Sequence, residues 1–349
     1  MSQVSIEEDE MNTLPTRALG TSGIEITTIG FGSLPMGGSQ WVSGRGAQDA
    51  DASIRTFRRA LERGINWIDT APIYGNGLAE ELIGTELASM PESERPLVFT
   101  KAGLLWDDDA PRAEPFRTGD PRAIRADVEA SLRRLRVERL DVLHMHWPPQ
   151  DDFTVEDYWP VFLELRDRGM VRAIGLSNHD ADQLRRAEQL GHVDVIQPPL
   201  SALNRDAAAQ LIPLAKASGT GVICYAPLES GLLSGGFSPE RVTQLPDDDW
   251  RRTHPDFTGE RFLENLAVVD ELKRIGAEHD VPASAVAIAW VLSVPGVTSA
   301  IAGARSPEQI DDWVDTAELT LSERELASIA TVIEEHDAGT GPANPRLAS

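Results

Sequence analysis

The 349-residue sequence contains one cysteine and no long apolar run. Cys224 alone cannot form an internal disulfide, which is typical of proteins from a reducing cytoplasm. No apolar segment approaches the roughly 20 residues that a membrane-spanning helix needs. The N-terminal segment MSQVSIEEDE is acidic and has no apolar core of the kind found in signal peptides. We therefore expect a cytoplasmic protein with no membrane partner.

Positive charge is also scarce. The chain carries 32 Lys and Arg against 56 Asp and Glu, a net charge of -24 at pH 7. Because such a surface repels a phosphate backbone, we expect no nucleic acid partner. Lysine occurs only at Lys101, Lys216 and Lys273, which makes each lysine informative.

Short apolar runs alternate along the chain with amphipathic helical segments. This alternation predicts parallel strands joined by right-handed crossovers. Eight such units predict an α/β fold, a single (β/α)8 TIM barrel. A doubly wound sheet is disfavoured, because the glycines near the first strand lack the spacing of a dinucleotide fingerprint. The expected strands are Thr28–Gly32, Ile65–Asp69, Leu97–Lys101, Leu140–His146, Val171–Leu176, Val193–Gln197, Gly221–Tyr225 and Thr298–Ala302.

The ends of the chain differ in pattern from this repeating part. We expect a flexible acidic tail over residues 1–15, one barrel domain over residues 16–336 and a C-terminal tail over residues 337–349. The turn sequence of residues 20–23 predicts an N-terminal hairpin before the barrel. Extra helices are expected after the eighth strand, the last of them over residues 322–335.

Polar or aromatic side chains stand at nearly every expected strand end. In barrels of this class, active sites lie at the C-terminal ends of the strands. Packing alone does not require such groups there, so we expect a functional site at this end. In chain order the residues are Asp69, Lys101, His146, Ser177, Asn178, Gln197, Tyr225 and Gly303 to Arg305.

Three of these residues suggest acid catalysis. Asp69 ends a strand and Tyr74 lies in the following turn, although a capping Asp and an exposed Tyr would give the same pattern. Asp69 would keep Lys101 charged, and a charged lysine is a poor Schiff-base nucleophile. The lysine charge favours a phenolate and lowers the pKa of Tyr74 from the ordinary tyrosine value of ~10. Together the three residues predict a general acid.

Two histidines occur on one face of the fourth strand. A metal site at His144 and His146 would need further ligands at other strand ends, where Gln197 and Tyr225 are poor substitutes. We therefore expect no metal. His146 is expected to donate a hydrogen bond to a substrate oxygen, and His144 to lie deeper as a core residue with its hydrogen bonds satisfied.

Six segments in order resemble motifs of the aldo-keto reductase family: DTAPIYGNGLAEELIG, VFTKAG, SLRRLRVERLDVLHMHWP, IGLSNH, CYAPLESGLLSG and IAGARSPEQI. The segments QPPLSALNRDA and DDDWRRTHPDF resemble its general-stress and aryl-aldehyde branch. The resemblance implies a barrel that reduces a small carbonyl substrate with a nicotinamide cofactor, NADPH more often than NADH. It also implies a catalytic tetrad of Asp69, Tyr74, Lys101 and His146.

The resemblance and the side-chain chemistry together suggest the cofactor-binding residues. Amide and hydroxyl groups suit the carboxamide, an aromatic ring can stack, and Arg305 can pair with a 2′-phosphate, which favours NADP. Two departures concern the same site: Trp313 replaces the usual Asn, and Gly236 stands where a phosphate-facing lysine is usual. The full set is Ser177, Asn178, Gln197, Tyr225, Leu228, Gly231, Leu233, Gly303, Arg305 and Gln309.

Trp41, Trp106 and Trp147 follow three of the expected strands and suggest an aromatic substrate pocket. Tryptophans used only for packing would give the same pattern. The long segment 235–261 suggests a lid. We expect a monomer or weak homo-oligomer. The alternatives are an NADPH-binding sensor with slow turnover, an NAD-dependent alcohol or sugar dehydrogenase, and a Schiff-base aldolase that uses Lys101.

Overall fold

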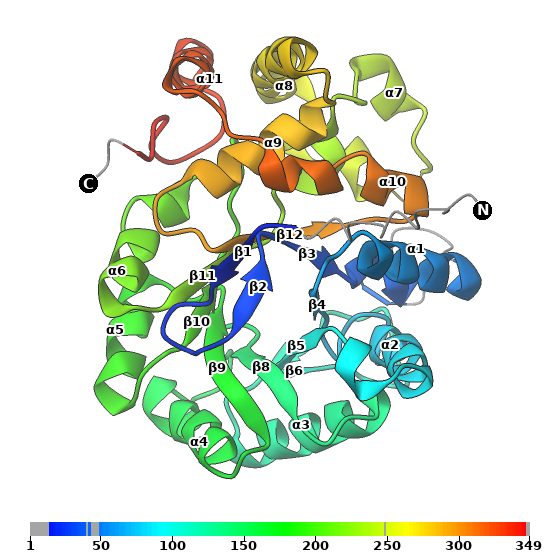
Figure 1. Ribbon diagram of the computed structural model, residues 1–349, viewed down its shortest axis with the longest axis vertical. Helices are drawn as coiled ribbons and strands as arrows, with labels where there is room; N and C mark the ends of the chain where they lie inside the picture. The colour runs from blue at the N-terminus through cyan, green and yellow to red at the C-terminus, as the bar shows by residue number, and fades with distance from the viewer. Residues whose placement is uncertain (1–13, 40, 43–48, 248, 347–349) are drawn as a thin grey trace, which may run out of the picture.

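Eight parallel strands close into a barrel in the computed structural model, which describes residues 14–39, 41–42, 49–247 and 249–346. Each strand pairs with the next along the chain, and the last pairs with the first (Figure 1). The predicted (β/α)8 barrel is therefore confirmed, and the strand bounds agree with the expected ones to within two residues. The strands are β3 (Ile29–Gly32), β4 (Trp67–Asp69), β5 (Leu97–Ala102), β8 (Leu140–Met145), β9 (Val171–Ser177), β10 (Val195–Gln197), β11 (Gly221–Cys224) and β12 (Ser299–Gly303).

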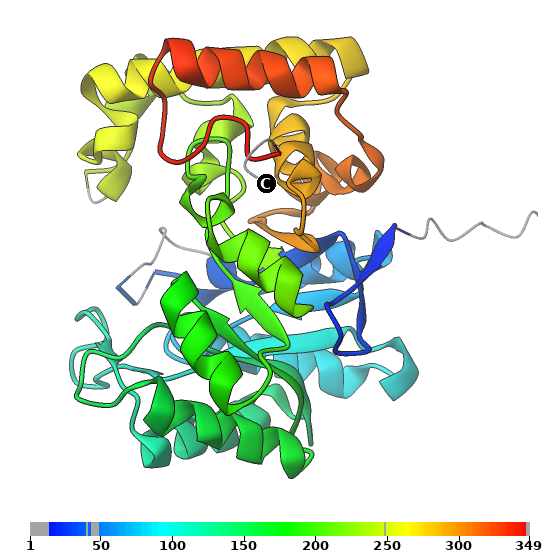
Figure 2. The same ribbon diagram turned by 90° about the vertical axis from the view of Figure 1, so that its left-hand side faces the viewer.

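Helices surround the barrel and cover its strands (Figure 1). The long helix α8 packs against α9 and α11, which thickens one side of the molecule (Figure 2). The helices are α1 (Ala50–Glu62), α2 (Leu78–Ser89), α3 (Pro121–Leu135), α4 (Val155–Asp167), α5 (Ala181–Leu190), α6 (Leu211–Ser218), α7 (Pro239–Thr243), α8 (Gly259–His279), α9 (Ala283–Ser293), α10 (Pro307–Asp311) and α11 (Glu323–Glu335).

The predicted N-terminal hairpin is present as β1 (Thr16–Ala18) and β2 (Glu25–Thr27). It lies across one end of the barrel (Figure 1), where it brings apolar side chains into the barrel interior. The interior is therefore a packed core and not a pore. This core contains Leu19, Ile24 and Ile26 of the hairpin segment together with Trp67, Phe99, Val142, Ala173, Val195, Ile223 and Ile301.

The structure describes most of the C-terminal tail and of the suspected lid, but little of the expected N-terminal tail. Residues 1–13 of the expected acidic tail lie outside the described residues. After α11 the chain returns to the barrel, where the buried Arg205 side chain donates hydrogen bonds to the carbonyls of Ala338, Gly341 and Pro342. The segment 235–261 folds into α7 and two short 3₁₀ helices, η5 (Trp250–Arg252) and η6 (Pro255–Phe257). No helix of the described residues is long and apolar enough to cross a membrane.

Candidate active site

The turn that carries Tyr74 is fixed by a close backbone contact. The turn follows β4, and the 3₁₀ helix η1 (Leu34–Gly37) after β3 lies against it. A Cβ atom at Gly37 would lie 2.6 Å from the Gly75 nitrogen, and one at Gly75 would lie 2.4 Å from the Gly37 carbonyl oxygen. Gly75 also has a φ of 66°. Neither position has room for a larger residue, so this contact sets the position of the Tyr74 backbone.

A buried ion pair lies beneath the tyrosine. Lys101 Nζ lies 2.7 Å from Asp69 Oδ2, 2.9 Å from the Thr70 carbonyl oxygen and 3.4 Å from the Tyr74 hydroxyl. Both charged residues are at most 3% exposed. Burial lowers the pKa of Lys101, and the negative charge of Asp69 opposes that shift. The three residues therefore meet as predicted, with the lysine between the carboxylate and the phenol.

Gln197 holds the other oxygen of the aspartate. Its Nε2 donates to Asp69 Oδ1 at 2.7 Å, from strand β10 on the opposite side of the barrel. The sequence does not predict this bond, since it suggests only cofactor binding for Gln197. Two residues 128 positions apart give no sequence signal for such a contact. Asp69 is thus fully engaged by Lys101 and Gln197.

A second buried carboxylate supports the strand that carries the lysine. Glu80, in the first turn of α2, accepts from Thr100 Oγ1 at 2.7 Å and from Arg134 Nε at 2.7 Å. Its side chain is fully buried. Glu80 therefore links α2 to β5 and α3 next to the Tyr74 turn, in addition to favouring the start of α2.

The two histidines lie at different depths. The rings of His146 and Tyr74 meet edge-on, with their centroids 6.1 Å apart. Burial and the charge of Lys101 hold the pKa of His146 well below its ordinary value of 6.5, so its imidazole is neutral near pH 7. His144 is fully buried, as predicted, and burial lowers its pKa to about 3. Neither ring nitrogen of His144 has a well-formed hydrogen bond within the described chain, although the contact of the ring with the Thr100 backbone opposes the lowering of its pKa.

A cleft of about 930 Å³ opens above these residues at the C-terminal end of the barrel. Asp69, Tyr74 and His146 line it, and Lys101 lies just behind them. Among the described residues, no cluster of three or more His, Cys, Asp or Glu could hold a metal ion. Most of the other predicted site residues also line the cleft: Trp41, Trp147, Ser177, Asn178, Gln197, Tyr225, Leu228, Gly231, Gly303, Arg305 and Gln309.

Two predicted residues are not on the wall of the cleft. Leu233 is fully buried in the hydrophobic core, because its turn directs the side chain inward. The Trp106 indole N–H donates to Asp108 at 2.8 Å, and the Arg134 guanidinium lies over its ring. Trp106 therefore packs its own loop. Trp313 is only 3% exposed and belongs mainly to the core, although it reaches the edge of the cleft.

Amide and hydroxyl groups form a network on the far wall of the cleft. Asn178 has a φ of 63°; its Nδ2 donates to the His146 carbonyl at 2.9 Å, and its Oδ1 accepts from the Tyr225 hydroxyl at 2.6 Å. Ser177 Oγ donates to the Gln197 backbone carbonyl at 3.1 Å. An amide oxygen has two lone pairs and an amide nitrogen has two hydrogens. Asn178 Oδ1 and Gln197 Nε2 therefore retain capacity for a planar amide ligand.

Backbone groups and arginines dominate the other end of the cleft. Glu229, Ser230 and Gly231 have successive φ values of 42°, 54° and 92° in the 3₁₀ segment η4 (Glu229–Ser234). Arg251 lines the cleft here, held by two hydrogen bonds to Asp249 of 2.9 and 2.6 Å. Gly236 stands in this region where a lysine is usual, and Arg251 supplies a positive charge that the motif does not predict. Arg251 lies in the long segment 235–261, and the local sequence pattern does not predict the path of that segment.

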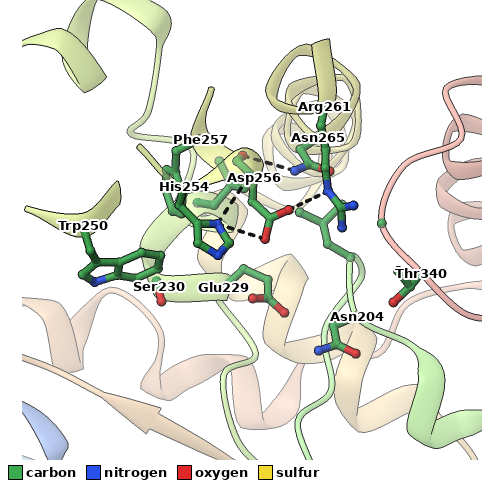
Figure 3. Close-up of a pocket in the computed structure, with 13 residues that line it drawn as sticks. Asn204, Glu229, Ser230, Trp250, His254, Asp256, Phe257, Arg261, Asn265 and Thr340 are labelled. Carbon is green, nitrogen blue, oxygen red and sulfur yellow. Dashed lines mark hydrogen bonds and ion pairs between the residues drawn. The ribbon is translucent and has the colours of Figure 1, made fainter. Parts of the chain in front are cut away.

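A second, smaller cavity has a volume of about 360 Å³ and is lined partly by η4, through Glu229, Ser230 and Leu232. Figure 3 shows residues that line it. Arg261 pairs with Asp256 at 2.6 Å there, and Glu229 accepts from Ser201 Oγ at 2.7 Å. Ser230 lines both this cavity and the cleft. The cavity lies beside the strained turn, and Asp69, Tyr74, Lys101 and His146 do not line it.

The comparisons with known proteins agree with this geometry. Residues 28–334 match the model of the aldo/keto reductase family, so the chain belongs to that family. An aldo-keto reductase of Bacillus subtilis is 32% identical, covering 91% of this chain and 93% of that protein. An NADH-specific methylglyoxal reductase of Escherichia coli is 31% identical over 90% of this chain and 97% of its own length. A glycerol dehydrogenase structure from Gluconobacter oxydans has a TM-score of 0.83 and 33% identity, covering 94% of this chain and 96% of that one.

The Gly37 contact predicts a steric effect on catalysis. Gly37→Ala places a methyl group against the Tyr74 turn, so the turn must shift and the hydroxyl leaves its position beside Lys101. We expect kcat to fall at least about tenfold, since catalysis depends on geometry at the ångström scale. Steady-state rates and a melting curve measure the two effects. An unchanged kcat would show that this contact does not position Tyr74.

Asp127 of α3 predicts a pH effect on stability. Its carboxylate accepts from the Gly103 N–H at 3.1 Å, and burial raises its pKa from 3.8 to about 7. The folded state thus holds this proton more tightly than the unfolded state, so stability is lost as pH rises through that interval. Asp127→Asn should raise the Tm more at pH 8 than at pH 5. The exposed control Asp182→Asn should show no such difference, and an equal shift at both pH values would contradict the prediction.

Proposed function

We propose that the chain is an NADP(H)-dependent reductase of aldehydes or ketones in which Tyr74 is the general acid. The observation that carries this proposal is the buried contact of Lys101 with both Asp69 and the Tyr74 hydroxyl, at the floor of a large cleft. A proton donor supported by a buried cation suits a reaction in which negative charge develops on an oxygen atom.

The residues of the cleft fit a nicotinamide cofactor. Asn178 and Gln197 would hold the carboxamide, Tyr225 would face the ring, and the backbone at Gly231 would face the pyrophosphate. Arg305 would pair with a 2′-phosphate, which supports NADP over NAD. When bound, the reduced cofactor supplies the hydride that reaches the carbonyl carbon.

Side chains of this protein donate the proton and stabilise the negative charge that its transfer leaves behind. Tyr74 donates its hydroxyl proton to the carbonyl oxygen of the substrate, and the adjacent Lys101 stabilises the phenolate that remains. His146 is neutral, so it acts as a hydrogen-bond donor to the same oxygen and not as the acid. Asp69, held by Gln197, keeps Lys101 in place throughout.

Two relatives support a second candidate. One is named as an NADH-specific methylglyoxal reductase and another as a glycerol dehydrogenase. The same groups can run the reaction toward oxidation, with the phenolate of Tyr74 as the base. An NAD-dependent alcohol dehydrogenase is therefore the alternative. Initial rates with NADPH and NADH on aldehydes, and with NADP⁺ and NAD⁺ on alcohols, separate the two.

The proposal predicts that Tyr74→Phe lowers kcat by about two to four orders of magnitude while NADPH still binds. The variant keeps the ring but loses the transferred proton. Stopped-flow rates measure turnover, and quenching of NADPH fluorescence measures binding. Near-normal turnover in this variant would contradict the assignment.

A matched control is Tyr158→Phe, which removes a buried hydroxyl from α4 that bonds His179 at 2.7 Å; neither residue lines the cleft. It is expected to lower Tm but not kcat. Strong NADPH binding with no reduction of any carbonyl by the wild type would favour a sensor. Borohydride trapping of a carbonyl on Lys101 would favour an aldolase.

A further inference from the structure

Arg117 lines the cleft on a firmly held backbone. It ends β7 (Phe116–Arg117), which pairs with β6 (Leu104–Leu105) in the loop after β5. Its carbonyl oxygen accepts from the Gln150 N–H at 2.9 Å. The next residue, Thr118, donates to Asp151 at 2.6 Å. The backbone is thus fixed on both sides, by the neighbouring strand and by the loop after β8.

The guanidinium of Arg117 lies over an aromatic wall of the cleft. Its central carbon is 4.2 Å from the ring centroid of Trp147, which directly follows His146 in the chain. Both residues line the same cleft as Tyr74. The charge of Arg117 is also one of the causes that lower the pKa of His146, so it is felt at the catalytic histidine.

No described acid neutralises this arginine. Glu114 also lines the cleft, but it is exposed and forms no ion pair with Arg117 within the described chain. Asp69 is engaged by Lys101 and Gln197. Arg117 therefore presents its positive charge to the cleft with no carboxylate partner among the described residues.

We infer that Arg117 binds a carboxylate on the substrate, which makes an aldehyde acid the preferred substrate class. The inference rests on the proposed carbonyl reduction. Stacking on Trp147 occupies one face of the guanidinium and leaves its N–H edge for a planar, bidentate partner. A carboxylate carries one negative charge, which a single arginine matches. Arg251 and Arg305 lie at the proposed cofactor end of the cleft.

The test compares each acid with its own methyl ester, so that only the charge differs. Two pairs suffice: succinic semialdehyde and para-formylbenzoate, each beside its ester. For the wild type we expect kcat/KM for the better acid to exceed that for its ester by about tenfold or more, as a charge-assisted hydrogen bond implies. The difference should appear mainly in KM.

Three variants test the residue. Arg117→Gln should bring the acid-to-ester ratio close to one, and Arg117→Lys should keep part of the preference. Arg122→Gln removes the same charge from an exposed site on α3 and should leave the ratio unchanged. If Arg117→Gln lowers rates for acid and ester equally, its role is to pack Trp147, and the inference fails.

The outcomes also separate this inference from the proposed function. Reduction of the esters at least as well as the acids by the wild type would overturn the role of Arg117 while reduction stands. No reduction of either substrate with NADPH or NADH would overturn the proposed function itself. A preference for glycolaldehyde phosphate over glycolaldehyde, without one for carboxylates, would assign Arg117 to phosphate and contradict the inference.

Discussion

The buried Lys101–Asp69 ion pair is the interaction on which the rest of the site depends. Removing two charges from water costs several kcal/mol per ion unless hydrogen bonds replace the lost hydration. Here the lysine donates to Asp69, to the Thr70 carbonyl and toward Tyr74, and Gln197 takes the remaining aspartate oxygen. The ion pair is stable in the protein interior because each charge has hydrogen-bond partners. One of those partners is Tyr74, the proposed acid.

The barrel brings these groups together from distant parts of the chain. Asp69 ends β4, Lys101 lies in β5 and Gln197 ends β10 across the barrel. Tyr74 is the exception, since it lies in a turn and not on a strand. The Gly37–Gly75 contact therefore fixes the position of the turn, as hydrogen bonding between neighbouring strands fixes the positions of the other residues.

Much of this arrangement could be predicted from the sequence. Short apolar runs between amphipathic helical segments predict the strands, and the side chains at the strand ends point to Asp69, Lys101 and His146. The contacts that depend on closure of the barrel could not be predicted, such as the bond between Gln197 and Asp69. Closure of the barrel determines which strand ends face one another. Local sequence patterns carry no information about distances across the barrel.

Irregular segments account for the remaining differences. Leu233 fits the expected motif, but the left-handed turn before it sends the side chain into the core. Trp106 lies in a loop that folds back on itself, so its indole meets Asp108 and not the cleft. Arg117 and Arg251 reach the cleft from long loops, where neither periodicity nor strand position predicts a side chain's direction.

The most direct test of the account is the single-turnover rate of aldehyde reduction by Lys101→Met with NADPH already bound. If the lysine supports proton donation by Tyr74, this rate falls by about two to four orders of magnitude while NADPH affinity is retained. Lys273→Met, which removes a half-exposed lysine from α8, should leave the rate unchanged. A Lys101→Met rate within about threefold of the wild type would contradict the account.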